Sequence, residues 1–136
     1  MRILAVDPGK KHIGLAISDP SGTIANPLMI LTHKSRGTDV DRIIEVVMKN
    51  AIEKIIVGQS IDDENGQPTF EGRQSARLAE ALRCRTSVPI ELWDEAYSTQ
   101  DARHAQIMMG ASRKKRSGHL DDLAATLILQ SYLDKY

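Results

Sequence analysis

The stretch LAVDPGKKHIGLAISD, residues 4–19, decides the fold of this chain. An apolar run ends at Asp7, Pro8 and Gly9 mark a turn, and a second largely apolar segment covers residues 12–18. Two strands joined by so short a turn predict an antiparallel hairpin. A buried strand that ends in a carboxylate is unusual unless a cation sits beside it, because an unpaired buried charge is very costly. The stretch therefore predicts both a sheet and a cation at its edge.

The rest of the chain predicts a mixture of strands and helices. Apolar spacing and turn residues predict strands at 25–32, 54–58 and 88–94, helices at 39–51, 69–83, 98–109 and 121–132, and loops at 59–68 and 110–118. Thr38 is the expected N-cap of the first helix. Three antiparallel strands followed by strand–helix units predict an α/β fold, a mixed five-stranded sheet with helices on both faces.

Length and composition indicate one domain spanning residues 1–136, in a cytoplasmic protein. Apolar residues make up 41% of the chain, and the single cysteine, Cys84, excludes an internal disulfide and fits a reducing compartment. No segment resembles a signal peptide or a membrane span, so we expect no membrane partner. Basic and acidic residues are equal in number, at 18 each. A nucleic-acid partner must therefore be argued from local patches of charge.

Three carboxylates from separate segments are expected to converge. Asp7 ends the first strand, Glu95 follows the last strand, and Asp121 opens the final helix. Carboxylates at the carboxyl ends of strands lie where α/β active sites form. Three of them around one point would make a site for a hard cation such as Mg²⁺.

Each carboxylate also has a plain structural explanation. Asp7 fits a solvated turn, Glu95 fits an exposed loop or the first turn of a helix, and Asp121 fits ordinary helix capping. Neighbouring strand residues point to opposite faces, so only one of Asp94 and Glu95 can face Asp7 if both are in the strand. Asp122 is a weaker candidate ligand than Asp121.

A basic run lies directly before the last helix. It comprises Arg113, Lys114, Lys115 and Arg116, and it is either a solvated charge run or a contact for the phosphate backbone of nucleic acid. We add Lys10 and Lys11, in the turn after Asp7, to the candidate nucleic-acid-binding residues. The aromatic content of 4% argues against base-stacking platforms, and we expect Phe70 and Trp93 to be packing residues.

These motifs together resemble the YqgF/RuvX family of small bacterial proteins with an RNase H fold. The matching residues are 4–19, 55–58, 93–95, Ser98, Thr99, Ala102, 112–116 and 121–133. The family is described as Holliday-junction-resolvase-like and as nucleases that mature the 16S ribosomal RNA precursor. The resemblance implies a metal-dependent endonuclease acting on precursor ribosomal RNA or branched DNA, as a monomer or homodimer.

The resemblance also implies roles for individual residues. The family's acidic triad falls on Asp7, Glu95 and Asp121, which would serve as catalytic residues and as ligands of Mg²⁺ or Mn²⁺. With two ions, Asp7 would bridge them and the other two carboxylates would be outer ligands.

Two positions depart from the family pattern. Gln59-Ser60 stands where the family usually has Leu-Pro, and Ala96 stands where it usually has an arginine beside the acidic site. Arg73 and Arg103 are the candidates to replace that cation. Two alternatives remain: a non-catalytic nucleic-acid-binding protein in ribosome assembly, and a relative of the sugar-kinase/actin fold, which would need a second domain for which the chain has no room.

Overall fold

The computed structural model describes residues 1–97 and 120–135, without the side chains of residues 120–122. The elements in chain order are β1 (Ile3–Pro8), β2 (His12–Ser18), β3 (Ala25–Thr32), α1 (Arg36–Lys49), β4 (Lys54–Gln59), α2 (Phe70–Arg83), β5 (Ile90–Asp94) and α5 (Leu120–Lys135). The expected helix at 98–109 lies outside the described residues. Within the part of the chain that is described, no helix is both long and apolar enough to cross a membrane.

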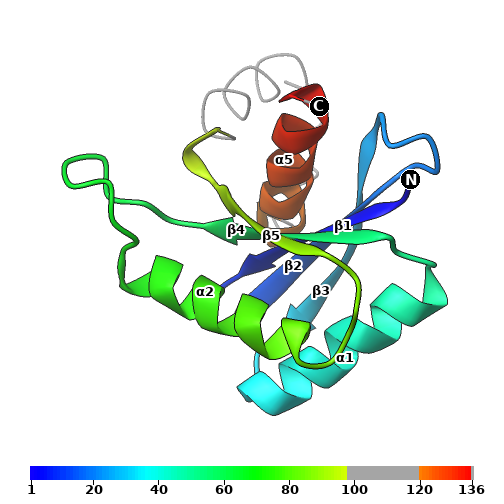
Figure 1. Ribbon diagram of the computed structural model, residues 1–136, viewed down its shortest axis with the longest axis horizontal. Helices are drawn as coiled ribbons and strands as arrows, with labels where there is room; N and C mark the ends of the chain where they lie inside the picture. The colour runs from blue at the N-terminus through cyan, green and yellow to red at the C-terminus, as the bar shows by residue number, and fades with distance from the viewer. Residues whose placement is uncertain (98–119, 136) are drawn as a thin grey trace.

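The strands form one five-stranded sheet in the order β3-β2-β1-β4-β5 (Figure 1). β1 is central: it pairs antiparallel with β2 and parallel with β4, and β4 pairs parallel with β5. β2 and β3 complete the antiparallel meander that the turn residues predicted. The mixed five-stranded sheet is therefore confirmed.

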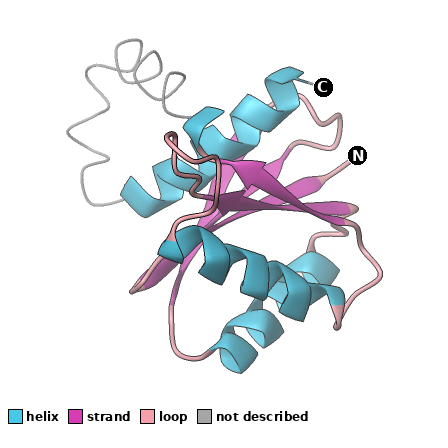
Figure 2. Ribbon diagram, turned by 60° about the vertical axis from the view of Figure 1, so that its left-hand side comes forward, coloured by secondary structure: helices cyan, strands magenta, loops and turns pink. Residues whose placement is uncertain are grey.

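Helices cover both faces of the sheet, as predicted (Figure 2). α1 and α2 pack on one face, where alternate strand residues such as Leu4 and Val6 point into a large apolar core. The residues of opposite parity, including Ala5 and Ile56, face α5 in a smaller core. Trp93 is buried in this second core, as expected.

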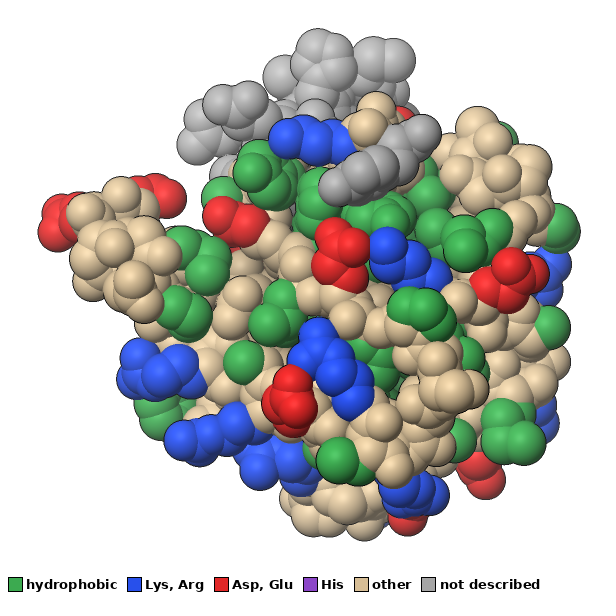
Figure 3. Space-filling view, viewed as in Figure 1, with side chains coloured by type: hydrophobic (Ala, Val, Ile, Leu, Met, Phe, Trp, Pro, Cys, Tyr) green, Lys and Arg blue, Asp and Glu red, His purple; other side chains and the backbone are tan. Residues whose placement is uncertain are grey.

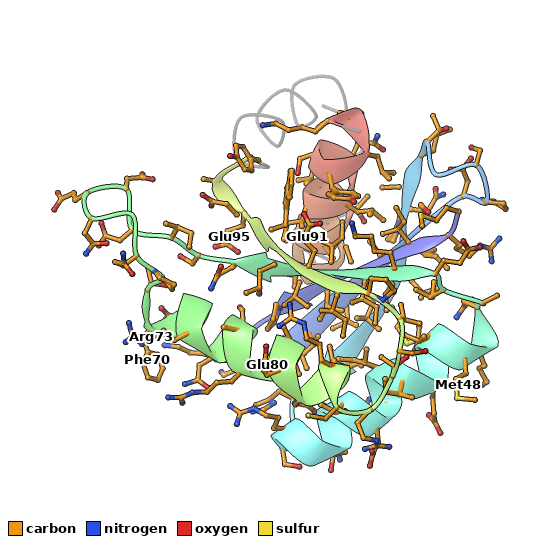
Figure 4. All side chains as sticks on the ribbon, viewed as in Figure 1. Met48, Phe70, Arg73, Glu80, Glu91 and Glu95 are labelled. Atoms are coloured by element: carbon orange, nitrogen blue, oxygen red, sulfur yellow. The ribbon has the colours of Figure 1, made fainter. Side chains whose placement is uncertain are left out.

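Two local predictions were wrong. Ser35, and not Thr38, caps α1: the Ser35 hydroxyl accepts a hydrogen bond from the Thr38 amide at 3.2 Å, so the helix begins three residues earlier. Phe70 is not a packing residue, because its side chain is 59% exposed at the start of α2. Figure 4 shows Phe70 and Arg73 pointing away from the sheet, with the Arg73 guanidinium 5.9 Å from the ring centroid.

A close approach to β4 fixes the position of α5. A Cβ atom at Gly58 would lie 2.8 Å from Cδ1 of Ile128, so a larger residue would force this side chain or the helix to move. Nearby, the Trp93 indole donates a hydrogen bond to the Ser131 hydroxyl at 3.0 Å, and the ring meets Tyr132 edge-on. Lys54 donates to the Tyr132 hydroxyl at 2.6 Å, which ties the same helix to the amino end of β4.

Gly58→Ala should destabilise the protein by about 1–3 kcal/mol, because the added methyl group overpacks a buried contact with Ile128. Urea denaturation of the purified variant measures this change. Gly37→Ala is the control: Gly37 lies in α1 with no neighbouring atom within 4 Å of an added Cβ, so alanine should raise stability by up to about 1 kcal/mol. Equal stability of Gly58→Ala and the wild type would show that α5 does not need the glycine.

Candidate active site at the carboxyl ends of the strands

Asp7 lies near the carboxyl end of the central strand β1, opposite Gly14 of β2. By strand alternation it shares a face with Ile3 and Ala5, which pack under α5. Its side chain is half-buried. The turn that follows needs Gly9, because a Cβ atom there would lie 2.4 Å from the carbonyl oxygen of His12.

Glu95 lies one residue beyond the end of β5 (Figure 4). Its amide donates to the carbonyl oxygen of Gln59 at 3.0 Å, which continues the pairing of β5 with β4 past the last strand residue. The Asp94 carboxylate accepts a hydrogen bond from the Ala96 amide at 2.9 Å and is thereby used in the local turn. Trp93, two residues before Glu95, packs on the α5 side, whereas Glu95 itself lies in the turn that follows the strand.

The strand register brings these two carboxylates to one edge of the sheet. Val6 is level with Val57, so Asp7 is level with Gly58, which in turn is level with Trp93. Glu95 follows Trp93 by two residues on the adjacent parallel strand. Asp7 and Glu95 thus lie at the same end of the sheet. Their convergence on one metal site stays a prediction.

The direction of α5 carries its first turn toward the same edge. Tyr132 contacts Lys54 at the amino end of β4, whereas Ile128 lies against Gly58 near the carboxyl end. Continuing seven residues toward the start of the helix adds about 10 Å in that direction. Ala125, Ile128 and Tyr132 of this helix pack on the sheet. The side chain of Asp121 lies outside the described residues, so its place beside the two strand-end carboxylates stays a prediction.

The electrostatic surroundings of Glu95 suit a cation. Burial raises the pKa of its carboxyl group, and the negative charges of Asp94 and Glu71 raise it further. A divalent cation would offset this accumulation of negative charge. Among the residues whose side chains are described, no group of three or more His, Cys, Asp or Glu is placed to hold a metal ion. The described residues thus supply two of the three predicted ligands.

The predicted basic residues lie in two places. Lys10 and Lys11 are exposed in the turn after Asp7, and Lys10 lies 3.9 Å from a carboxylate oxygen of Glu71. Arg113, Lys114, Lys115, Arg116 and Arg103 lie outside the described residues. Arg73 donates to the carbonyl oxygen of Pro68 at 3.2 Å, so this guanidinium is held at the start of α2.

The sequence analysis missed one buried polar pair. Asp39 in α1 is only 2% exposed, and its carboxylate contacts Nδ1 of His33 and accepts the Lys34 amide at 3.1 Å. An aspartate in the first turn of a helix is commonplace, so nothing in the sequence marked it as buried. The turn between β3 and α1, which brings His33 over the helix, creates the contact.

Comparison with protein families gives a match over nearly the whole chain. The family model described as "RuvX: Holliday junction resolvase" matches residues 1–135. A protein from Caldanaerobacter subterraneus subsp. tengcongensis, named "Putative pre-16S rRNA nuclease", is 42% identical over 135 residues, covering 98% of this chain and 96% of the relative. A protein of the same name from Listeria monocytogenes serovar 1/2a is 39% identical, covering 98% of both chains.

Solved structures share the fold at lower identity. RuvC of Thermus thermophilus, solved with a Holliday junction substrate, has a TM-score of 0.65 and 18% identity, over 99% of this chain and 96% of RuvC. The fowlpox virus resolvase, solved with Holliday junction DNA, has a TM-score of 0.60 and 13% identity, over 99% and 98%. These likenesses establish a RuvC-like RNase H fold.

In metal-free buffer, Glu95→Gln should be more stable than the wild type at neutral pH. The raised pKa means that ionised Glu95 opposes folding, an effect that grows as pH rises through the folded-state pKa and is absent below the ordinary value of 4.5. The gain in unfolding free energy should therefore disappear between neutral pH and about pH 4, as followed by urea denaturation. Glu64→Gln, in an exposed loop, is the control and should show no such trend. A pH-independent difference for Glu95→Gln would contradict the electrostatic explanation.

Proposed function

This chain belongs to the RuvX family, as its sequence resemblance predicted, and we propose that it is a metal-dependent nuclease that hydrolyses phosphodiester bonds in structured nucleic acid. The observation that carries the proposal is the placement of Asp7 and Glu95. Both lie at the carboxyl edge of the sheet, and strand alternation puts Asp7 on the face crossed by α5. Strand ends of this kind are where α/β proteins bind and process their ligands.

In this proposal Asp7, Glu95 and Asp121 hold Mg²⁺ or Mn²⁺. The like-charge surroundings of Glu95 support a cation there. Such ions stabilise the charge that develops on the attacking and leaving oxygens during phosphodiester hydrolysis. The protein's own contribution is to fix the carboxylates on rigid strands. β1 is hydrogen-bonded on both sides, and the Glu95 amide is bonded to Gln59.

The substrate we propose is the precursor of 16S ribosomal RNA, which appears in the names of the relatives at about 40% identity. Branched DNA is the comparison substrate, because the structures that share the fold were solved with Holliday junctions. Ala96 leaves the position after Glu95 without a cation, so we expect slow turnover. A cleavage assay on both substrates, with and without Mn²⁺, tests the function itself. Binding without cleavage of either substrate would favour the alternative of a non-catalytic assembly protein.

Asp7→Asn should abolish Mn²⁺ binding measured by calorimetry and lower cleavage by more than about a hundredfold, because ligands of one metal site act as a unit. Glu95→Gln should lose cleavage to a similar extent. Circular dichroism confirms that each variant remains folded.

Asp94→Asn is the matched control for Glu95→Gln. Asparagine keeps the side-chain oxygen that accepts a hydrogen bond from the Ala96 amide, so the turn should be preserved. Most of the cleavage activity should therefore remain. If Asp94→Asn were inactive while Glu95→Gln cleaved normally, the second ligand would be Asp94. Unchanged Mn²⁺ affinity in Asp7→Asn would remove the basis of the proposed site.

Replacing Arg113, Lys114, Lys115 and Arg116 together by serine should weaken nucleic-acid binding regardless of sequence. The slope of log affinity against log salt should become shallower by about 1 for each phosphate that the protein no longer neutralises. Fluorescence anisotropy at several salt concentrations measures both quantities. The same affinity and slope as the wild type would identify the run as a solvated surface.

A further inference from the structure

A pocket lies beside the carboxyl end of β1, on the opposite face of the sheet from α5. It is a cavity of about 360 Å³ between the turn after β1, the start of α1 and the side of α2. Pro8, Ile13 and Leu78 contribute apolar surface, whereas His33, Arg36 and Gln74 contribute polar groups. Ligand pockets of this size, with apolar walls and a few polar groups, hold small organic ligands.

The buried carboxylate in the lining belongs to Asp39. Its oxygens contact Nδ1 of His33 and accept a hydrogen bond from the Lys34 amide, so the protein itself supplies partners for this group.

The arginine in the lining has a neutral partner. The guanidinium of Arg36 donates to the side-chain oxygen of Gln74 at 3.0 Å. Among the residues that the structure describes, Arg36 forms no ion pair, whereas Arg83 and Arg85 each contact a carboxylate. Figure 3 shows Lys and Arg side chains, with acidic side chains among them, on the α2 side of the molecule, where Arg73, Arg77, Glu71 and Glu80 are exposed. Within the lining, the Arg36 guanidinium is the group that favours an anionic ligand.

We propose that this pocket binds one nucleotide of the strand that is cleaved, with its phosphate on Arg36 and its sugar or base against the apolar wall. This inference rests on the proposed nuclease function. Pro8 and Gly9, which line the pocket, follow Asp7 directly. At about 3.3 Å per residue the pocket begins within roughly 7 Å of Asp7 along the backbone. A nucleic-acid strand cut at Asp7 would therefore have neighbouring nucleotides close to this pocket.

Arg36→Gln should weaken binding of a fluorescein-labelled oligouridylate about tenfold, because a charge-assisted hydrogen bond to phosphate is lost. Arg36→Lys, which keeps the charge, should retain part of the affinity. Fluorescence anisotropy of the full chain in EDTA measures the affinities. The absence of metal keeps this result independent of cleavage, so it can fail or succeed separately from the proposed nuclease function.

Arg42→Gln is the matched control. Arg42 is on the same helix and donates to the carbonyl oxygen of Thr32 at 2.9 Å, but it does not line the pocket. The affinity of Arg42→Gln for the oligouridylate should equal that of the wild type. Equal losses of oligonucleotide affinity for Arg36→Gln and Arg42→Gln would indicate general charge attraction. That result would overturn the proposal that the pocket binds a nucleotide.

Competition identifies the ligand. Uridine monophosphate should displace the oligonucleotide from the wild type at concentrations well below those needed for inorganic phosphate, because the apolar wall contributes to binding. Displacement by both compounds at the same concentration would overturn the assignment to a nucleotide. An oligonucleotide affinity unchanged by Arg36→Gln would overturn the assignment to the cleaved strand.

Discussion

The packing of α5 against the sheet at Gly58 is the constraint on which the candidate site depends. β1 and β5 bring Asp7 and Glu95 to one edge through backbone pairing alone, but the last carboxylate belongs to a separate helix. That helix is held by a glycine contact, an indole–hydroxyl hydrogen bond and a lysine–tyrosine hydrogen bond. All three lie between the middle and the far end of α5. The first turn is therefore directed to the strand ends by contacts made elsewhere along the helix.

Two glutamates, Glu91 and Glu95, have different roles because they lie at opposite ends of the β5 segment. Glu91 lies toward the amino end of the sheet and accepts a hydrogen bond from Lys54 at 2.9 Å, which ties β5 to β4 (Figure 4). Glu95 lies at the carboxyl end, where burial and two neighbouring carboxylates raise its pKa. The ion pair of Glu91 with Lys54 stabilises the fold. At Glu95, by contrast, negative charges lie close together, which lowers the stability of the folded protein. The repulsion among these carboxylates is relieved only when a cation or a proton binds beside Glu95.

The fold could be predicted further than the site. Turn residues and apolar alternation predicted all five strands, because those signals are local. The cap at Ser35 was missed because two hydroxyl residues that can cap a helix, Ser35 and Thr38, lie within one turn of each other. Asp7 could be singled out from its position after a buried run. The hydrogen bond from the Ala96 amide to Asp94 and the contact of His33 with Asp39 could not be read from the sequence, because both depend on how the folded chain turns. Which of Asp94 and Glu95 binds metal stays a prediction. The grouping of Asp7, Glu95 and Asp121 into one metal site stays a prediction.

The turn at Pro8 and Gly9 connects the two functional surfaces proposed for this protein. On the α5 side it follows Asp7, and on the α1 and α2 side it forms part of the nucleotide pocket. Its shape is fixed, because any side chain at Gly9 would collide with the carbonyl oxygen of His12, at the start of β2. The residue after Glu95 is Ala96, which carries no charge. Arg36 supplies a fixed cation on the other side, held by Gln74. A nucleic acid bound by Arg36 would reach Asp7 around the edge of the sheet. In this proposal phosphate is bound on one face of β1 and hydrolysed on the other.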